Sequence, residues 1–200
     1  MKVLIIGNSP KVLENEFGKE IDKFDIVIRI NNFETKGFEN QVGTKTDYLF
    51  CTFATRPSAM VQNFPRDKMY MFVADKYGQD EFIQTRVNKA NGMQIDIKKV
   101  NILDSKIYLH ELNKEIGIDL PQRPLTGTIC MFWAMKHYPE SQIFTYGIDY
   151  YKEGGETLYR YTGFNNKREP YFHHFVKEQQ YYNKLIEENK IIGDLSNAKL

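Results

Sequence analysis

Residues 124–151 read PLTGTICMFWAMKHYPESQIFTYGIDYY and contain, in order, a turn, a helix, a strand and a polar aromatic loop. Apolar side chains fill most of residues 129–138, which predicts a helix that buries most of its surface. Pro139 ends this helix, because proline cannot continue it. The apolar run 142–146 predicts a buried strand, with residues 147–151 at its carboxyl end. Ligands bind at that rim in open α/β sheets, and a helix N-terminus beside it attracts anions.

The N-terminal segment has the same character. Residues 1–6 form an apolar run, a tight turn follows, and residues 11–18 are expected to form a helix with Ser9 as its cap. Strand, tight turn and helix together open a Rossmann-like nucleotide-binding fold. The turn has one glycine, Gly7, and therefore lacks the dinucleotide fingerprint. A mononucleotide phosphate or ribose, held by the backbone and Asn8, fits it better.

The rest of the chain alternates between expected strands and helices. Further strands are expected at residues 24–30, 47–53, 69–74 and 191–192, with a weaker one within 100–109, and helices at 57–63, 79–88, 110–116 and 173–189. Residues 35–46 read as a polar loop, and 193–200 as a frayed tail. Residues 152–171 combine glycines with tyrosines and lack an apolar period, which indicates disorder or a lid over a ligand. We therefore predict one α/β domain over residues 1–200, with a mostly parallel central sheet, helices on both faces and a flexible lid loop.

Composition excludes several classes of protein. The 200 residues carry a net charge of +1, which argues against a dedicated nucleic-acid binder. Cys51 and Cys130 lie in apolar contexts without metal-ligand spacing, which is typical of buried thiols in a reducing compartment. The apolar N-terminus is too short for a signal peptide, and no run approaches the roughly 20 apolar residues of a membrane span. We expect a cytoplasmic protein; peripheral attachment at the inner membrane and homo-oligomerisation stay open.

Candidate site residues gather where expected strands end and helices begin. The sequence has no Asp-x-Asp, HExxH, Cys/His cluster, P-loop or GxSxG motif, so no metal site is predicted. What remains is a rim of glycine and polar residues: Gly7, Asn8, Asn31, Asn32, Thr126, Gly127, Asp149, Tyr151, His173 and Glu178. By pattern alone, adjacent asparagines after a strand read as a turn, and His173-His174 as a solvated helix end.

The histidine pair also permits a chemical interpretation. A helix N-terminus favours the neutral imidazole, which accepts a proton near pH 7. Glu178 lies more than one turn beyond His173. We expect it to orient the helix or pair with a lysine rather than contact that histidine.

Residues 7–47, GNSPKVLENEFGKEIDKFDIVIRINNFETKGFENQVGTKTD, resemble the large sialyl motif of the family 29 sialyltransferases. Residues 125–127 (LTG) together with 146–149 (YGID) resemble the small sialyl motif. His173, followed by four residues and Glu178, is similar to the very short motif. The four matched segments (7–47, 125–127, 146–149 and 173–178) occur in the expected order, which makes chance agreement a poor explanation. At these positions the resemblance therefore replaces the interpretations as a turn or a solvated helix end.

Two stretches, 123–127 and 147–151, are also similar to the bacterial family 42 sialyltransferases. The resemblance implies inverting, metal-independent transfer of sialic acid from CMP-sialic acid to a sugar hydroxyl. It implies a single Rossmann-like domain, a variant of the GT-A type, and no cofactor. The partners would be a nucleotide-sugar donor and a glycan acceptor. The chain lacks the membrane anchor and paired cysteines of the eukaryotic members, which fits a bacterial or viral cytosolic protein.

The resemblance also assigns catalytic roles. His173 would be the general base, although His174 remains an alternative; the spacing to Glu178 favours His173. Tyr151 would hydrogen-bond the leaving phosphate, with Tyr159 or Tyr161 from the lid. An arginine near the site in the family 42 proteins matches Arg123.

The other implied residues bind the donor, and none binds a metal: Gly7, Asn8, Ser9, Asn31, Asn32, Thr126, Gly127, Gly147, Ile148, Asp149 and Tyr161. Within this set, Asn8 and Asn31 would hold the phosphate and ribose. Thr126 and Gly127 would meet the nucleotide at the helix N-terminus. Residues 147–149 would line the cytidine pocket, mostly through backbone atoms.

Alternative functions remain at this point. The same chemistry fits another CMP-activated nonulosonate or a Kdo-like sugar. A nucleotide-binding Rossmann module without catalysis is a second possibility. A dinucleotide oxidoreductase is disfavoured because the glycine fingerprint is absent. The sequence does not indicate the acceptor sugar or the linkage.

Overall fold

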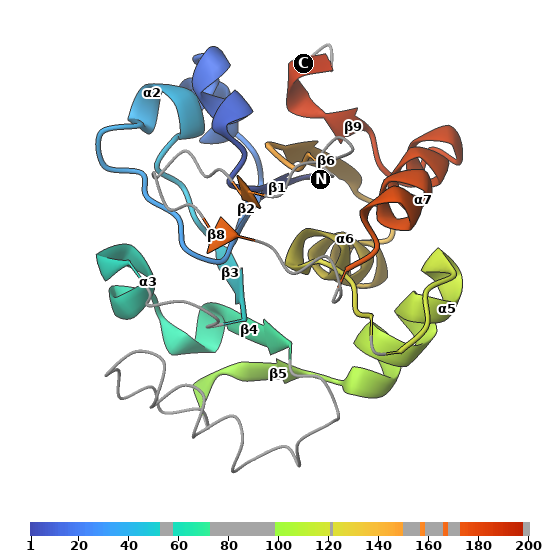
Figure 1. Cartoon of the computed structure of the whole chain (residues 1–200). Helices are drawn as coiled ribbons and strands as arrows, with labels where there is room; N and C mark the ends of the chain where they lie inside the picture. Colours follow the sequence, from blue (N-terminus) through green and yellow to red (C-terminus); the bar gives the residue numbers. More distant parts are fainter. Residues whose placement is uncertain are drawn as a thin grey trace.

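The computed structural model of the chain describes residues 1–52, 58–72, 99–120, 122–149, 157–158, 166–167 and 173–197. At its centre lies a seven-stranded sheet in the order β5-β4-β3-β2-β1-β6-β9 (Figure 1). Its strands are β1 (Lys2–Ile6), β2 (Ile26–Ile30), β3 (Tyr48–Cys51), β4 (Met69–Phe72), β5 (Asn101–Leu103), β6 (Gln142–Tyr146) and β9 (Gly193–Asp194). Every adjacent pair is parallel. The predicted Rossmann-like α/β fold is confirmed.

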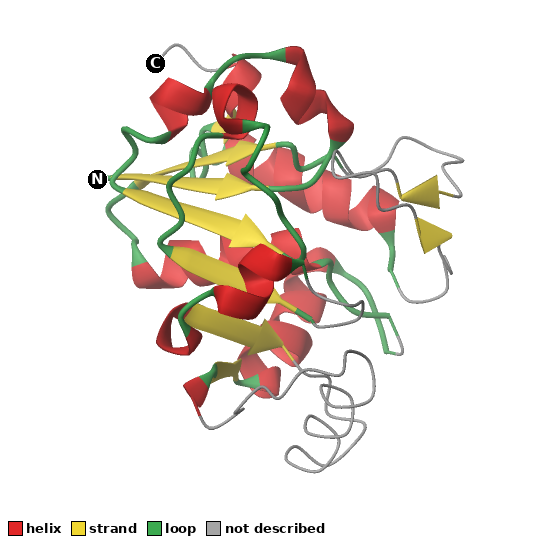
Figure 2. Cartoon of the chain, turned by 90° about the vertical axis from the view of Figure 1, so that its left-hand side faces the viewer, coloured by secondary structure: helices red, strands yellow, loops and turns green. Residues whose placement is uncertain are grey.

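The strand order reverses direction at β1. Val3 lies between Ile26 of β2 and Ile143 of β6. From β1 the chain builds the sheet one way through β5, and then the other way through β6 and β9. The arrows point the same way, so the carboxyl ends of β1 and β6 share one edge (Figure 2). A reversal of this kind opens the crevice in which α/β proteins bind ligands.

Helices cover both faces of the sheet. The helical elements are η1 (Pro10–Glu14), α1 (Gly18–Ile21), α2 (Glu39–Val42), α3 (Ala59–Asn63), η2 (Arg66–Lys68), the π-helical η5 (Lys106–Glu111), α5 (Leu112–Ile116), α6 (Thr126–His137), α7 (Phe175–Glu187) and η7 (Leu195–Asn197). Figure 1 shows α5, α6 and α7 on one side and α2 and α3 on the other. Alternate residues of β1 serve the two faces: Val3 and Ile5 pack with α6, and Leu4 and Ile6 with η1 and α1.

Helix α6 is the central packing element. Its first eight residues after Thr126, Gly127 to Ala134, are all buried, as the all-round apolar pattern predicts. The Trp133 ring contacts those of Tyr70 and Phe50, with centroids 4.8 and 5.0 Å apart. The helix ends at His137, two residues before Pro139, and β6 occupies residues 142–146, both as expected.

The prediction of a single helix over residues 11–18 is wrong. Instead, a 3-10 turn, η1, begins after Ser9, whose hydroxyl accepts a backbone N–H bond two residues on at 3.3 Å. The chain is then extended at Asn15, with φ −134°, and α1 follows. This break lets the ring of Phe17 turn onto that of Tyr146, 5.6 Å away in an edge-on arrangement. A continuous helix could not make that contact and also close against β6.

The predicted tail, residues 193–200, is wrong in its first part. It opens with β9, so the last strand lies two residues later than the expected 191–192. The backbone N–H of Ile192 donates to the carbonyl of Ile143 at 2.7 Å, which draws the following residues into the sheet. Leu195 is 1% exposed in the core. Because pairing and burial hold this segment, it does not fray as far as residue 197.

Other expectations meet the structure only in part. The helix expected at 110–116 starts earlier, because η5 runs directly into α5. The helix expected at 79–88 lies outside the described residues. Of the predicted lid, 152–171, the structure describes an antiparallel pair, β7 (Thr157–Leu158) and β8 (Asn166–Lys167). The pair lies on the carboxyl-end side of the sheet (Figure 2), and the lid itself stays a prediction. Among the described residues, no helix has both the length and the apolarity to cross a membrane.

The expected loop 35–46 is organised by a buried arginine and contains α2. Arg29 is 1% exposed. Its guanidinium donates to the carbonyls of Val42 and Lys45 at 2.7 and 3.0 Å, and to the hydroxyl of Thr46 at 2.9 Å. The loop is therefore held by charge-assisted hydrogen bonds rather than by apolar packing alone.

We expect Arg29→Met to lower the free energy of unfolding by about 3 kcal/mol, because these buried acceptors lose a charged donor. Arg29→Lys is the matched control: it keeps the charge but not the planar fork, and should lose less. Urea denaturation at unchanged slope measures both. Equal losses for the two variants would show that the retained charge contributes nothing and that the loop depends on the planar fork alone.

Candidate active site

Two glycines let the ends of β1 and β6 meet. The N–H of Gly7 donates to the carbonyl of Tyr146 at 2.7 Å, and a Cβ added at Gly7 would lie 2.1 Å from the carbonyl oxygen of Gly147. Gly147 has φ +64°, and a Cβ there would lie 2.3 Å from Val12. Side chains at either position would force the strand ends apart. Both predicted glycines thus lie where the carboxyl ends of β1 and β6 meet.

Ser9 links the two strand ends. Its hydroxyl donates to Oδ2 of Asp149 at 2.7 Å, and its N–H donates to the carbonyl of Gly147 at 3.2 Å. Ser9 is 3% exposed. The structure therefore brings Ser9 and Asp149 together, and the hydrogen bond between them fixes the loop after β6.

Asn8 presents a buried acceptor. Its Nδ2 donates to the carbonyl of Ile30 at 2.8 Å, which ties the turn after β1 to the end of β2. Its Oδ1 is buried and has no hydrogen-bond partner among the described residues. Buried acceptors in native structures are nearly always satisfied. A ligand hydroxyl in the crevice would supply the missing donor.

Asn31 connects three elements at the same rim. It has φ +53°, a conformation that asparagine tolerates better than most residues. Its Nδ2 donates to the Thr126 hydroxyl at 3.3 Å, and its Oδ1 accepts the Thr52 N–H at 3.3 Å. Asn32 points elsewhere: its Oδ1 accepts the N–H of Ser58 at 3.1 Å. Asn31 therefore lies on the rim beside Thr126, whereas this bond ties Asn32 to the segment before α3.

The N-terminus of α6 holds a buried carboxylate. Glu178 of α7 is fully buried, and its Oε2 accepts the N–H of Leu125 at 2.8 Å and the Thr128 hydroxyl at 2.5 Å. Acidic groups are stabilised at a helix N-terminus. Glu178 thus orients α7 against α6, the first of the two roles expected for it. Gly127 lies beside Ile148, whose side chain would be 3.5 Å from an added Cβ.

The two histidines have different partners. Nδ1 of His173 lies 2.8 Å from the carbonyl oxygen of Arg123. A carbonyl only accepts, so Nδ1 carries the proton and Nε2 carries the lone pair. Nδ1 of His174 instead accepts the N–H of Lys177 at 3.4 Å and caps α7. This tautomer makes His173 Nε2 a proton acceptor, whereas the His174 ring serves the helix end.

Most predicted residues therefore meet on one rim. Gly7 and Gly127 both border Ile148, and Asn31 donates a hydrogen bond to Thr126. His173 is held by the carbonyl of Arg123, which lies three residues before Thr126 in the sequence. Arg123 contributes its backbone carbonyl to this arrangement. Three predicted tyrosines lie outside the described residues: Tyr151, Tyr159 and Tyr161. In the described part of the chain, no three His, Cys, Asp or Glu side chains converge as metal ligands.

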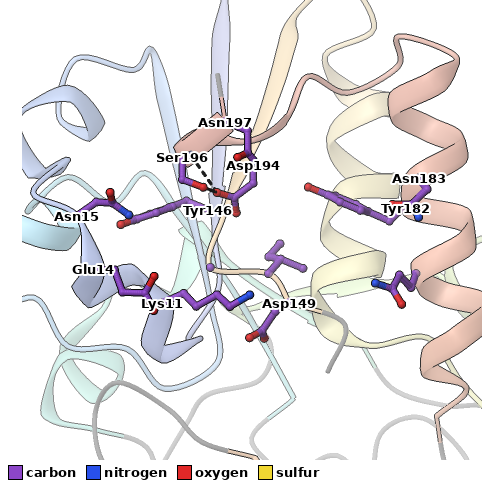
Figure 3. Close-up of a pocket in the computed structure, with 13 residues that line it drawn as sticks. Lys11, Glu14, Asn15, Tyr146, Asp149, Tyr182, Asn183, Asp194, Ser196 and Asn197 are labelled. Atoms are coloured by element: carbon purple, nitrogen blue, oxygen red, sulfur yellow. Dashed lines mark hydrogen bonds between the residues drawn. The ribbon is translucent and has the colours of Figure 1, made fainter. Parts of the chain in front are cut away.

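A pocket of about 350 Å³ adjoins this rim. It is bounded by η1, by residues 147–149, by α7 and by the segment 194–197 (Figure 3). Tyr146 and Tyr182 contribute rings; burial raises the pKa of Tyr182, and that of Tyr146 to about 12, so both hydroxyls stay protonated at neutral pH. The pocket residues that come from α7 and from the C-terminal segment were not predicted as site residues. Polar side chains spaced three and four residues apart on the last helix were the sequence signal that could have indicated them.

Most of the chain matches a known family. The profile of glycosyltransferase family 29 (sialyltransferase) matches residues 2–190. The chain belongs to this family. A mouse CMP-N-acetylneuraminate-beta-1,4-galactoside alpha-2,3-sialyltransferase is 23% identical to this family 29 chain over 98% of its length. A human CMP-N-acetylneuraminate-beta-galactosamide-alpha-2,3-sialyltransferase 4 is 28% identical over 67% of it.

Solved structures agree on the fold. The crystal structure of a mammalian sialyltransferase matches this family 29 chain with a TM-score of 0.66 and 20% sequence identity. The match covers 96% of this chain and 68% of the chain in that structure. A second, in complex with Gal-beta-1-3GalNAc-ortho-nitrophenol, has a TM-score of 0.65. The chain spans 58% of the length of the mouse relative.

Proposed function

We propose that this family 29 chain transfers sialic acid from CMP-sialic acid to a hydroxyl of a glycan acceptor, with inversion and without a metal ion. The observation that carries the proposal is the fixed His173 ring beside the N-terminus of α6. One local unit thereby offers both groups that the reaction needs. These are a base for the acceptor hydroxyl and a positive helix end for the leaving phosphate.

The donor fits the switch-point crevice. Its ribose would supply the hydroxyl that Asn8 Oδ1 lacks among the described residues. Its phosphate would lie near Thr126 and Gly127, where the first backbone N–H groups of α6 and the helix dipole favour an anion. Tyr151, with Tyr159 or Tyr161, would add hydroxyl donors as negative charge develops on the phosphate. Residues 147–149 would line the cytidine.

The acceptor hydroxyl must lose a proton as it attacks the anomeric carbon. The Arg123 carbonyl accepts from Nδ1 of His173, so Nε2 is the basic nitrogen of the neutral ring and would take the proton of the acceptor hydroxyl. The mouse relative is named for a beta-1,4-galactoside and the human relative for a beta-galactosamide, so a terminal galactose is the acceptor that we propose first. No residue need donate a proton to CMP, because the phosphate leaves as an anion.

Release of CMP from CMP-sialic acid in the presence of lactose or N-acetyllactosamine tests the activity. Turnover with CMP-Kdo but not with CMP-sialic acid would show that the donor is a Kdo-like sugar nucleotide instead of CMP-sialic acid. Binding of CMP without turnover on any acceptor would instead identify a non-catalytic nucleotide-binding module.

We expect the rate to be unchanged in EDTA, because the helix N-terminus and hydroxyl donors meet the phosphate charge. The measurement is the initial rate of CMP release before and after chelation. Loss of the rate in EDTA, with recovery on adding Mg²⁺ or Mn²⁺, would contradict the metal-independent mechanism while leaving the donor and acceptor in place.

A further inference from the structure

The pocket between η1 and α7 lies beside the donor crevice but is not lined by its central residues. It shares the segment 147–149 with the crevice, whereas Asn8, Asn31, Thr126 and His173 are not among its lining residues. The remaining walls come from η1, from α7 and from the C-terminal segment (Figure 3). Three elements far apart in the sequence thus converge on a cavity that shares only residues 147–149 with the proposed donor site.

The lining is rich in groups that both donate and accept hydrogen bonds. Side-chain amides come from Asn15, Gln179, Asn183 and Asn197. The rings of Tyr146 and Tyr182 stand on opposite sides of the upper pocket in Figure 3. Amides in this number suit hydroxyl groups, and a tyrosine ring offers an apolar face. The two tyrosine hydroxyls are already engaged, that of Tyr146 with the carbonyl of Val12 and that of Tyr182 with the hydroxyl of Thr145. The combination suits a polyhydroxylated ring.

Charge narrows the choice of ligand. Glu14, Asp149 and Asp194 contribute carboxylates, and among the described lining residues the only ammonium group is that of Lys11. A phosphate or a sialic acid would meet net repulsion here. The carboxylates do not converge as a metal site within the described part of the chain. Two of them are oriented by hydroxyl donors, Ser9 on Asp149 at 2.7 Å and Ser196 on Asp194 at 2.5 Å.

We propose that this pocket binds an uncharged sugar residue. Its volume of about 350 Å³ is at the lower end of the range for small-molecule sites, enough for one or two sugar rings. The sugar belongs either to the acceptor glycan, as a neutral residue behind the one that is modified, or to a separate glycan. The first source rests on the proposed transferase function; the binding itself does not.

Titration of the full chain with galactose, N-acetylglucosamine and lactose tests the binding by NMR. We expect a dissociation constant on the order of 1–10 mM for a ligand of this size. The side-chain amide signals of Gln179 and Asn183 should shift, and saturating CMP should not displace the sugar. Both residues are exposed, so Gln179→Ala with Asn183→Ala should preserve the fold and weaken binding roughly tenfold.

Gln180→Ala is the matched control, since Gln180 is exposed on the same helix but is not among the pocket residues. Three results would overturn the proposal: no shift with any neutral sugar, equal affinity in the double variant, or preference for N-acetylneuraminic acid. Kinetics then identify the source of a bound sugar. A raised KM for a neutral oligosaccharide acceptor in the double variant, but not in Gln180→Ala, indicates the acceptor; unchanged KM values indicate a separate glycan.

Discussion

Replacing His173 by asparagine is expected to lower kcat by about 10²–10⁴-fold while leaving CMP affinity nearly unchanged. Asparagine keeps an N–H that can donate to the Arg123 carbonyl, so the loop before α6 retains its contact. It offers no nitrogen of sufficient basicity, so the acceptor hydroxyl keeps its proton. The measurements are kcat for CMP release and the dissociation constant of CMP by calorimetry.

The neighbouring histidine provides the matched control. His174 accepts the Lys177 N–H as the cap of α7, and asparagine is itself a favourable N-cap residue. We therefore expect His174→Asn to retain activity within a few-fold. If His174→Asn were as inactive as His173→Asn, the ring assignment would fail. If both variants kept full activity, neither imidazole would be the base.

Local sequence patterns predicted the elements whose ends are decided locally. The apolar run of α6 is followed by Pro139, which stops any helix, and β6 occupies the next apolar run at residues 142–146. Both boundaries depend on residues within a few positions. The pattern therefore contained all the information needed.

Elements decided by distant contacts could not be predicted in this way. The hydroxyl of Ser9 caps η1 and also donates to Asp149, 140 residues away. The helix expected at 11–18 breaks where the chain turns to place Phe17 on Tyr146, a contact that local periodicity does not encode. The C-terminal segment becomes a strand only because β6 offers it a pairing edge.

The site residues also divide into those that the local sequence predicted and those that depend on distant contacts. Asn8 and Asn31 follow strands, so their place on the rim was readable from the sequence, and the structure puts them there. The sequence resemblance pointed to Arg123, but the structure shows that its carbonyl matters to His173. The polar face of α7 that lines the neutral pocket depends on where α7 docks, which no spacing reveals.

Glu178→Ala is expected to lower the free energy of unfolding by about 3–5 kcal/mol, or the Tm by about 10 °C. The carboxylate is fully buried and accepts from both the Leu125 N–H and the Thr128 hydroxyl. Its removal leaves two buried donors and a cavity between α6 and α7. Calorimetric or urea unfolding measures the loss, and Gln180→Ala, on the exposed face of α7, should change stability by less than about 0.5 kcal/mol.

A double-mutant cycle separates hydrogen bonding from packing. Glu178→Gln keeps the shape of the side chain, and Thr128→Val removes one donor with little change in volume. Because the two side chains share a bond of 2.5 Å, the cycle should show a coupling of about 1–2 kcal/mol in unfolding free energy. The N-terminus of α6 meets the donor phosphate in the proposed reaction, so Glu178→Gln should also lower kcat/KM, by up to about 10²-fold. Additive effects on stability together with unchanged kinetics would show that Glu178 only fills space, and that α6 is positioned by its apolar face alone.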